Sequence, residues 1–135
     1  MSRVSRSKEY LKTGFTGEAA AAARFRAYAA RAEREERPRL AEEWRKLAAA
    51  KDALAVKLLE AAGQVRDEGR ALADALAEER YENDILYPKM MRDVDGAASE
   101  IFREVVGAQA EHAERLSRLR SAVQAAEGDI EPLGG

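Results

Sequence analysis

The stretch LAAAKDALAV, from Leu47 to Val56, carries a helical pattern that recurs along the whole chain. Leu47 and Leu54 are one heptad apart, and Lys51 falls between them on the same helical stripe. Steps of four and three residues are typical of a helix whose apolar stripe is buried against neighbouring helices. Lys51 is therefore unexpected, because burying an unpaired charge is costly. The full stripe is Leu40, Trp44, Leu47, Lys51, Leu54 and Leu58.

The same spacing predicts four helices and an all-α fold. The first two cover about residues 9–35 and 38–62, and Pro38 separates them because proline suits the first turn of a helix. GQVRDEG (63–69) is the predicted connection to a third helix, which runs through LADALAEERYENDILYP toward residue 91 with a kink near Pro88. The fourth covers about residues 97–125. We expect a four-helix bundle over residues 9–126, between a flexible N-terminus (1–8) and a flexible tail (127–135).

Polar residues interrupt all four predicted stripes near their middles. In an aligned bundle these side chains would converge on one core layer, where they must bind one another, water or a metal. The alternative is that some stripes are misjudged and the polar groups reach solvent. The residues of this candidate core polar site are Glu18, Lys51, Glu79, Glu82, Gln109 and His112.

Three segments of the chain resemble the rubrerythrin branch of the ferritin-like proteins. They are FTGEAAAAARF (15–25), EERYENDILYP (78–88) and IFREVVGAQAEHAERL (101–116), and the likeness extends from Gly14 to Leu119 at low identity. The resemblance implies a ferritin-like four-helix bundle. It also implies that four residues sit where rubrerythrins keep iron ligands, namely Glu18, Glu79, Glu82 and His112.

The chain departs from the family at three ligand positions. The Glu-x-x-His of the second helix falls on Lys51 and Leu54, and the glutamate of the fourth-helix motif is Gln109. The chain also has no cysteine, so it lacks the rubredoxin-like tail that many family members use to deliver electrons. A lysine ammonium offers only donors and repels a cation. We therefore expect a degenerate site without a full di-iron centre, and no standard peroxidase reaction.

Two interpretations of the site remain open. In the first, Lys51 supplies the positive charge that a metal supplies in relatives, and a Glu/His/Lys cluster replaces the metals. In the second, the chain is a metal-binding oxidative-stress or metal-handling protein that keeps a single Fe, Mn or Zn ion. Its ligands would be Glu79, Glu82 and His112, with Glu18 as a candidate fourth ligand, and Gln109 would support them by a hydrogen bond. The alternative for Lys51 is a side chain that reaches solvent, with Asp52 solvated beside it.

The overall composition limits the other function classes. A net charge of −2 with 36% charged residues gives no basic field for nucleic acid. No apolar stretch approaches the ~20 residues of a membrane span, and the N-terminus does not resemble a signal peptide, so we expect a cytoplasmic protein. The absence of cysteine excludes disulfides and thiolate metal sites. The tail GDIEPLGG (128–135) is a candidate docking peptide for a protein partner.

The connection between the second and third helices bears on assembly. In the family these helices run parallel, so the connection must cross the length of the bundle. Residues 61–71, fully extended at ~3.3 Å each, reach only about 36 Å, which barely exceeds the ~30 Å length of a helix of ~20 residues. Exchange of helix pairs between two chains would relieve this constraint, so we expect a homodimer, with domain swapping as its possible form.

Overall fold

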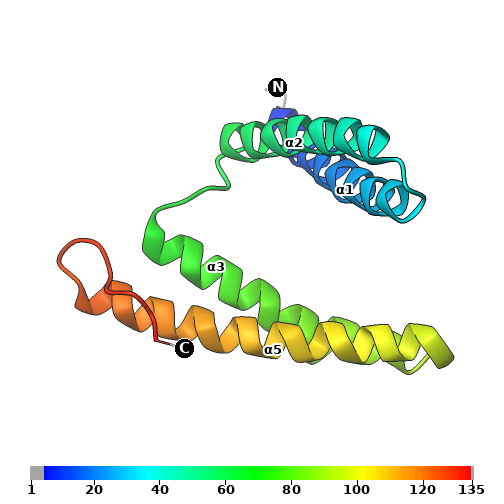
Figure 1. Ribbon diagram of the computed structural model, residues 1–135. Helices are drawn as coiled ribbons and strands as arrows, with labels where there is room; N and C mark the ends of the chain where they lie inside the picture. The colour runs from blue at the N-terminus through cyan, green and yellow to red at the C-terminus, as the bar shows by residue number, and fades with distance from the viewer. Residues whose placement is uncertain (1–4, 135) are drawn as a thin grey trace. The chain divides into compact units, whose positions relative to one another are not determined.

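The computed structural model describes residues 5–134 and is all-helical over that range, as predicted. The helices are coloured along the chain in Figure 1. They are α1 (Ser7–Arg34), α2 (Pro38–Ala61), α3 (Glu68–Tyr81), the π-helix η1 (Glu82–Leu86), α4 (Tyr87–Met91) and α5 (Gly96–Ala125). Because α3, η1 and α4 follow one another without a break, these elements match the four predicted helical stretches. Residues 1–4 of the N-terminal segment 1–8 lie outside the described residues, and the prediction of a flexible segment is wrong at Ser7 and Lys8, which belong to α1.

The chain divides into two compact units, one ending at Val65 and the other beginning at Arg66. The first unit is the hairpin of α1 and α2, which lie side by side (Figure 1). Pro38 occupies the start of α2, as predicted. Glu36 takes the left-handed conformation (φ 60°) that ends α1, and the N–H groups of Glu36 and Arg37 donate to the carbonyls of Glu33 and Ala32.

The helices of the first unit pack through alanine. On α2 the buried alanines recur every seven residues at Ala41, Ala48 and Ala55, and the same spacing reaches the buried Ala62 just after the helix. They lie beside the predicted leucine stripe, and Leu40, Leu47 and Leu54 stay 43 to 50% exposed. Small side chains allow the two helix axes to approach closely, so alanine makes the seam. The buried alanines of α1 are Ala21, Ala22, Ala29 and Ala32.

An aromatic cluster closes the end of this hairpin near the turn. Trp44 packs against the buried alanine cluster of Ala29, Ala32 and Ala41. Its ring centroid lies 5.2 Å from that of Phe25 and 5.0 Å from that of Tyr28. These spacings lie in the favourable range for aromatic pairs. Trp44 is therefore a packing residue of this hairpin.

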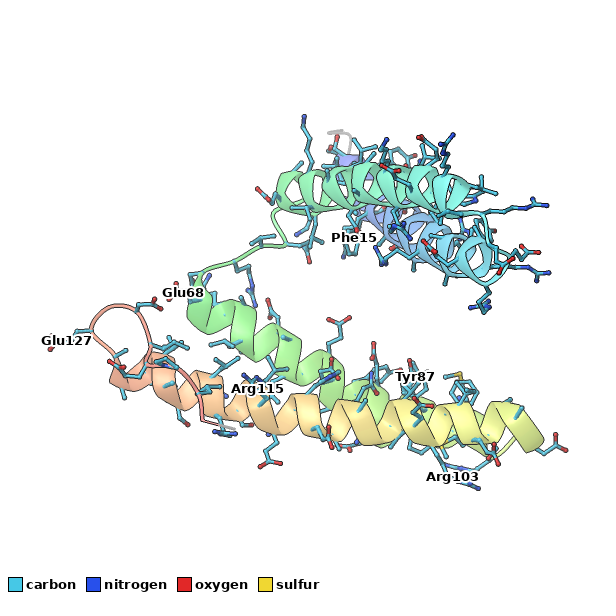
Figure 2. The ribbon with its side chains drawn as sticks, in the orientation of Figure 1. Phe15, Glu68, Tyr87, Arg103, Arg115 and Glu127 are labelled. Atoms are coloured by element: carbon cyan, nitrogen blue, oxygen red, sulfur yellow. The ribbon has the colours of Figure 1, made fainter. Side chains whose placement is uncertain are left out.

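The second unit packs α3, η1 and α4 along α5. Leu76 on α3 is its buried apolar residue. Tyr87, labelled in Figure 2, contacts Phe102 with 5.7 Å between the ring centroids. The predicted irregularity near Pro88 takes the form of the π-helix that precedes it. Pro88 has no N–H group to donate to the residue four before it, and the N–H of Tyr87 already bonds five residues back, to the Glu82 carbonyl.

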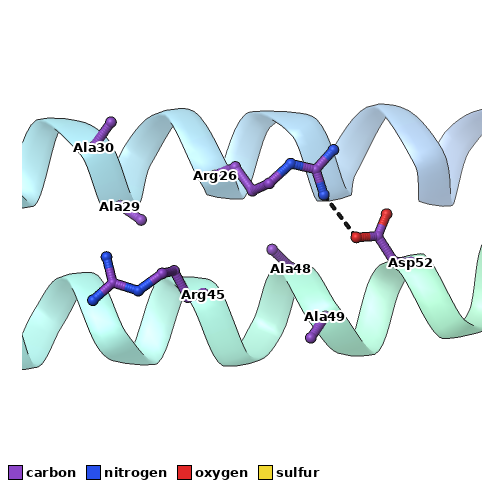
Figure 3. Close-up of a pocket in the computed structure, with 7 residues that line it drawn as sticks. All are labelled: Arg26, Ala29, Ala30, Arg45, Ala48, Ala49 and Asp52. Carbon is purple, nitrogen blue, oxygen red and sulfur yellow. Dashed lines mark hydrogen bonds and ion pairs between the residues drawn. The ribbon is translucent and has the colours of Figure 1, made fainter. Parts of the chain in front are cut away.

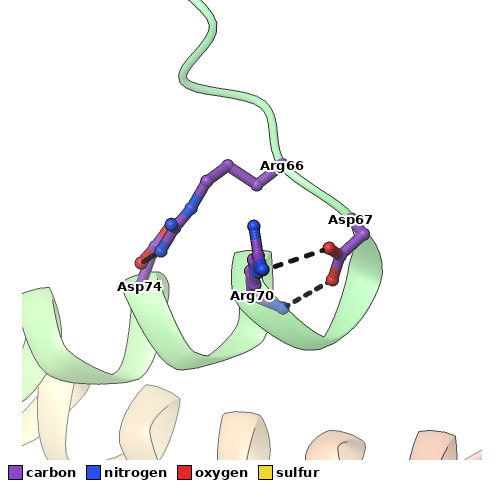
Figure 4. Close-up of polar contacts among 4 residues, drawn as sticks. All are labelled: Arg66, Asp67, Arg70 and Asp74. Carbon is purple, nitrogen blue, oxygen red and sulfur yellow. Dashed lines mark hydrogen bonds and ion pairs between the residues drawn. The ribbon is translucent and has the colours of Figure 1, made fainter.

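Local interactions explain where the connection between α2 and α3 begins and ends. Gly63, with φ 72°, ends α2: its N–H donates to the Glu60 carbonyl at 2.9 Å, and that of Gln64 donates to the Leu59 carbonyl at 3.2 Å. Asp67 caps α3 by accepting the N–H of Arg70 at 3.1 Å (Figure 4). The irregular connection thus occupies most of the predicted segment GQVRDEG (63–69).

The C-terminal tail carries no helix after Ala125. Arg118 of α5 donates to the carbonyl of Gly134 at 2.9 Å, and Ile130 and Leu133 are half-buried. The tail predicted as flexible thus has contacts with α5 in this structure. Over the described range, every helix is too short or too polar to cross a bilayer.

Candidate functional site

The first unit brings together Glu18 and Lys51 of the predicted polar site. The Lys51 Nζ atom lies 2.9 Å from the Glu18 Oε2 atom, and the two side chains are 33% and 27% exposed. Oε2 is fully covered and accepts no well-directed hydrogen bond, so the contact is an ion pair held by distance and charge. Lys51 therefore crosses from α2 to α1. This contact is the one expected if Lys51 neutralises the carboxylate of Glu18.

Asp52, the neighbour of Lys51, makes a separate contact. It accepts a hydrogen bond from Arg26 at 2.7 Å, and both side chains are half-exposed. Figure 3 shows this pair beside a shallow groove of about 430 Å³. Alanines line much of the groove, and Arg45 at its edge is paired with Glu33 at 3.1 Å. Because its arginines already have carboxylate partners, the groove offers no free charge to a ligand.

The second unit brings together Glu82 and Gln109. The Gln109 Nε2 atom donates to Oε2 of Glu82 in a very short hydrogen bond. Gln109 is 9% exposed and is the buried polar residue of the described chain. Glu82 is the first residue of η1, so the π-helix begins where the carboxylate meets α5. A neutral amide thus contacts one of the predicted ligand carboxylates.

Glu79 and His112 lie in the same unit at a longer distance. The His112 Nδ1 atom is 4.0 Å from the Glu79 Oε2 atom, beyond the length of a hydrogen bond. His112 is 61% exposed, whereas the Glu79 side chain is 25% exposed. The imidazole is near the carboxylate but does not satisfy it.

Three covered oxygens of this unit have no hydrogen-bond partner. They are Oε2 of Glu79, Oδ1 of Asn83 and Oε1 of Gln109. Buried acceptors without a donor are rare in native proteins and require an explanation. Asn83 was not among the predicted residues of the site. Its spacing of four residues from Glu79 was the available signal, because such residues are neighbours on a helix face.

The predicted metal ligands are only partly gathered. Among residues 5–134, no three His, Cys, Asp or Glu side chains are grouped closely enough to form a metal site by themselves. Lys51, Leu54 and Gln109, which the resemblance to rubrerythrins places at three ligand positions, carry neither a carboxylate nor an imidazole. Glu79, Glu82, Gln109 and His112 lie in one unit, and two of their oxygens, Oε2 of Glu79 and Oε1 of Gln109, have no hydrogen-bond partner.

Comparison with known proteins gives no family assignment: no family model matches the chain, and no curated protein matches it significantly.

Proposed function

We propose that this chain is a rubrerythrin-like, ferritin-like bundle protein with a degenerate di-iron site, in which a Glu/His/Lys cluster takes the place of the two metals. One observation carries the proposal: Lys51 and Glu18 form a 2.9 Å ion pair between α1 and α2. The ammonium places a positive charge against a half-buried carboxylate, at the position where the resemblance to rubrerythrins implies a metal ligand. A standard peroxidase reaction is not expected of such a site. That all six polar side chains share one core layer stays a prediction.

The proposal is tested by reversing the charge of Lys51. We expect Lys51→Glu to raise the affinity for Fe²⁺ or Mn²⁺, because a cation-repelling group becomes a ligand. Metal content is measured by elemental analysis after purification without chelators and dialysis against each metal. The control is Lys57→Glu, which makes the same change at an exposed position of α2. Equal metal content in the wild type and both variants would contradict the charge-substitution proposal.

A second candidate function is a metal-handling protein that binds one Fe, Mn or Zn ion through Glu79, Glu82 and His112, with Glu18 as the predicted fourth ligand. The unsatisfied oxygen of Glu79, 4.0 Å from the imidazole of His112, favours it. If this candidate is right, we expect about one metal ion per chain in the wild type and loss of that ion in the His112→Ala variant. Glu111→Ala, at the exposed neighbouring position, is the control. Metal-free wild-type protein would exclude this candidate.

We also propose that the protein is a cytoplasmic homodimer. The half-exposed leucines Leu40, Leu47 and Leu54 support an apolar contact surface on the first unit. Light scattering on the full-length chain tests the dimer, and a monomer at micromolar concentration would exclude it. The C-terminal tail remains a candidate docking segment for a protein partner.

A further inference from the structure

The groove between α1 and α2, drawn in Figure 3, lies between two ion pairs that run in opposite directions. At one end Arg26 of α1 faces Asp52 of α2 at 2.7 Å, and at the other end Arg45 of α2 faces Glu33 of α1 at 3.1 Å. The two charged residues of each helix are seven residues apart, so the pairs are separated by about 10.5 Å along the helices. The four side chains are 47 to 53% exposed. Positive and negative charges therefore alternate around the four corners of this face.

Small apolar residues lie between and beyond the two ion pairs on the same face. Ala30 of α1 and Ala49 of α2 are exposed, and each lies between the two charged residues of its own helix. Ala23 and Val56 continue the two stripes at steps of three and four residues, and Val56 is 53% exposed. The exposed leucines of α2 lie on the other face of the hairpin, since Leu47 and Ala49 are turned about 200° from each other.

We propose that this face binds the same face of a second copy of the chain, with α1 of each copy against α2 of the other. A two-fold axis parallel to the helices then brings Arg26 onto Asp52 of the second copy, and Arg45 onto Glu33 of the second copy. The register is the one already used within a single chain. The second copy needs no free charge on this face, because each arginine comes to lie between two carboxylates.

The apolar residues and the helix directions agree with this register. Ala49 lies opposite Ala30 of the second copy, and Val56 lies opposite Ala23, so apolar side chains meet one another. Every neighbouring pair among the four helices is antiparallel, as in up-and-down four-helix bundles. The 24 residues of α2 are ~36 Å long, and two helices are ~20 Å wide, so the face offers about 700 Å². This area approaches the ~800 Å² per partner of a standard interface.

The contact goes beyond the proposed homodimer, because it uses a different face from the leucines. The experiment measures self-association of the full-length chain by sedimentation equilibrium. Arg45→Glu and Glu33→Arg each gather like charges at one corner, so each variant alone should associate at least about tenfold more weakly than the wild type. An equal mixture of the two variants should recover the association, because each supplies the charge that the other lacks. Repulsion within each hairpin persists in the mixture, so recovery reports the contact between copies.

The control for charge is Lys57→Glu, an equal change at an exposed position of α2 outside the groove, which should leave association unchanged. Single cysteines test the register, because the chain has no cysteine of its own. A mixture of Ala30→Cys and Ala49→Cys chains should form a disulfide between copies on mild oxidation. Ala30→Cys mixed with Ala50→Cys, which lies outside the groove, should not.

Three results would overturn the inference. The first is a mixture of Arg45→Glu and Glu33→Arg that associates no better than either variant alone. The second is equal crosslinking of Ala30→Cys with Ala49→Cys and with Ala50→Cys. The third is an association that neither charge variant weakens, which would leave the homodimer through the leucines standing. A monomeric wild type would exclude both contacts.

Discussion

The two units of this chain solve the same packing problem with different chemistry. The first is closed by alanines that recur every seven residues on α2, and its one half-buried carboxylate faces an ammonium. The second has Leu76 and Gln109 as its buried residues, a π-turn, and three oxygens without donors. The same helical spacing of residues therefore produces two kinds of helix contact. Between α1 and α2 the carboxylate is paired with an ammonium. Between α3–η1 and α5 several oxygens lack hydrogen-bond donors. The second kind of contact is where the second candidate function places its metal ion.

The largest expected effect is a loss in the free energy of unfolding, and it tests how tightly α1 packs on α2. Ala48 is 2% exposed between α1 and α2, so Ala48→Leu should destabilise the protein by about 2–3 kcal/mol through overpacking. Thermal and urea unfolding followed by circular dichroism measure the loss. Ala50→Leu, on the exposed side of the same helix, should be nearly neutral. Similar unfolding midpoints for the two variants would show that α1 and α2 do not pack through the alanines.

The next effect compares the polar pairs of the two units. A double-mutant cycle on Glu18→Gln and Lys51→Met should give a coupling of about 1 kcal/mol, because the pair is short but a third exposed. The same cycle on Glu79→Gln and His112→Ala should give coupling near zero in metal-free protein, because the atoms are 4.0 Å apart and the imidazole is exposed. Chemical unfolding supplies both values. Equal coupling energies for the two pairs would show that the carboxylates of the two units do not differ in how well their charge is neutralised.

The smallest effect concerns the ion pair at the start of the second unit. Arg66 donates to both carboxylate oxygens of Asp74, at 2.9 and 2.5 Å, and these hydrogen bonds lower the pKa of Asp74 from its ordinary 3.8 (Figure 4). A lowered pKa in the folded state stabilises the fold above pH 3.8, and this contribution is lost as the pH falls through the lower value.

The measurement for this pair is the melting temperature of the wild type and of Arg66→Gln against pH. We expect a small, constant advantage of the wild type at neutral pH that disappears in acid. A difference that stays constant, or grows, below pH 3.8 would show that the pair does not act through the ionised Asp74. Lys57→Gln, an exposed change in the first unit, is the control for a general effect of charge.

Much of the fold could be predicted because helical signals are local. Pro38 at the start of α2 and Gly63 just past its end mark boundaries through their own backbone preferences. The polar positions of the candidate site were also visible, since they break a regular apolar period. Which of these polar residues pair with one another could not be predicted, because the spacing along a helix shows which face a residue lies on but not its distance from another helix. Lys51 with Glu18 and Gln109 with Glu82 are contacts between separate helices.

By itself, the sequence determined an all-helical chain, its helix limits to within a few residues, and the polar positions on each stripe. Only the tertiary structure decided that alanine, rather than the neighbouring leucines, joins α1 to α2, since packing selects the side chains that allow the closest approach of the helices. It also decided the π-turn at Glu82–Leu86 and the unpaired oxygen of Asn83. Both depend on how a helix fits its neighbour, which residue spacing along one helix does not encode.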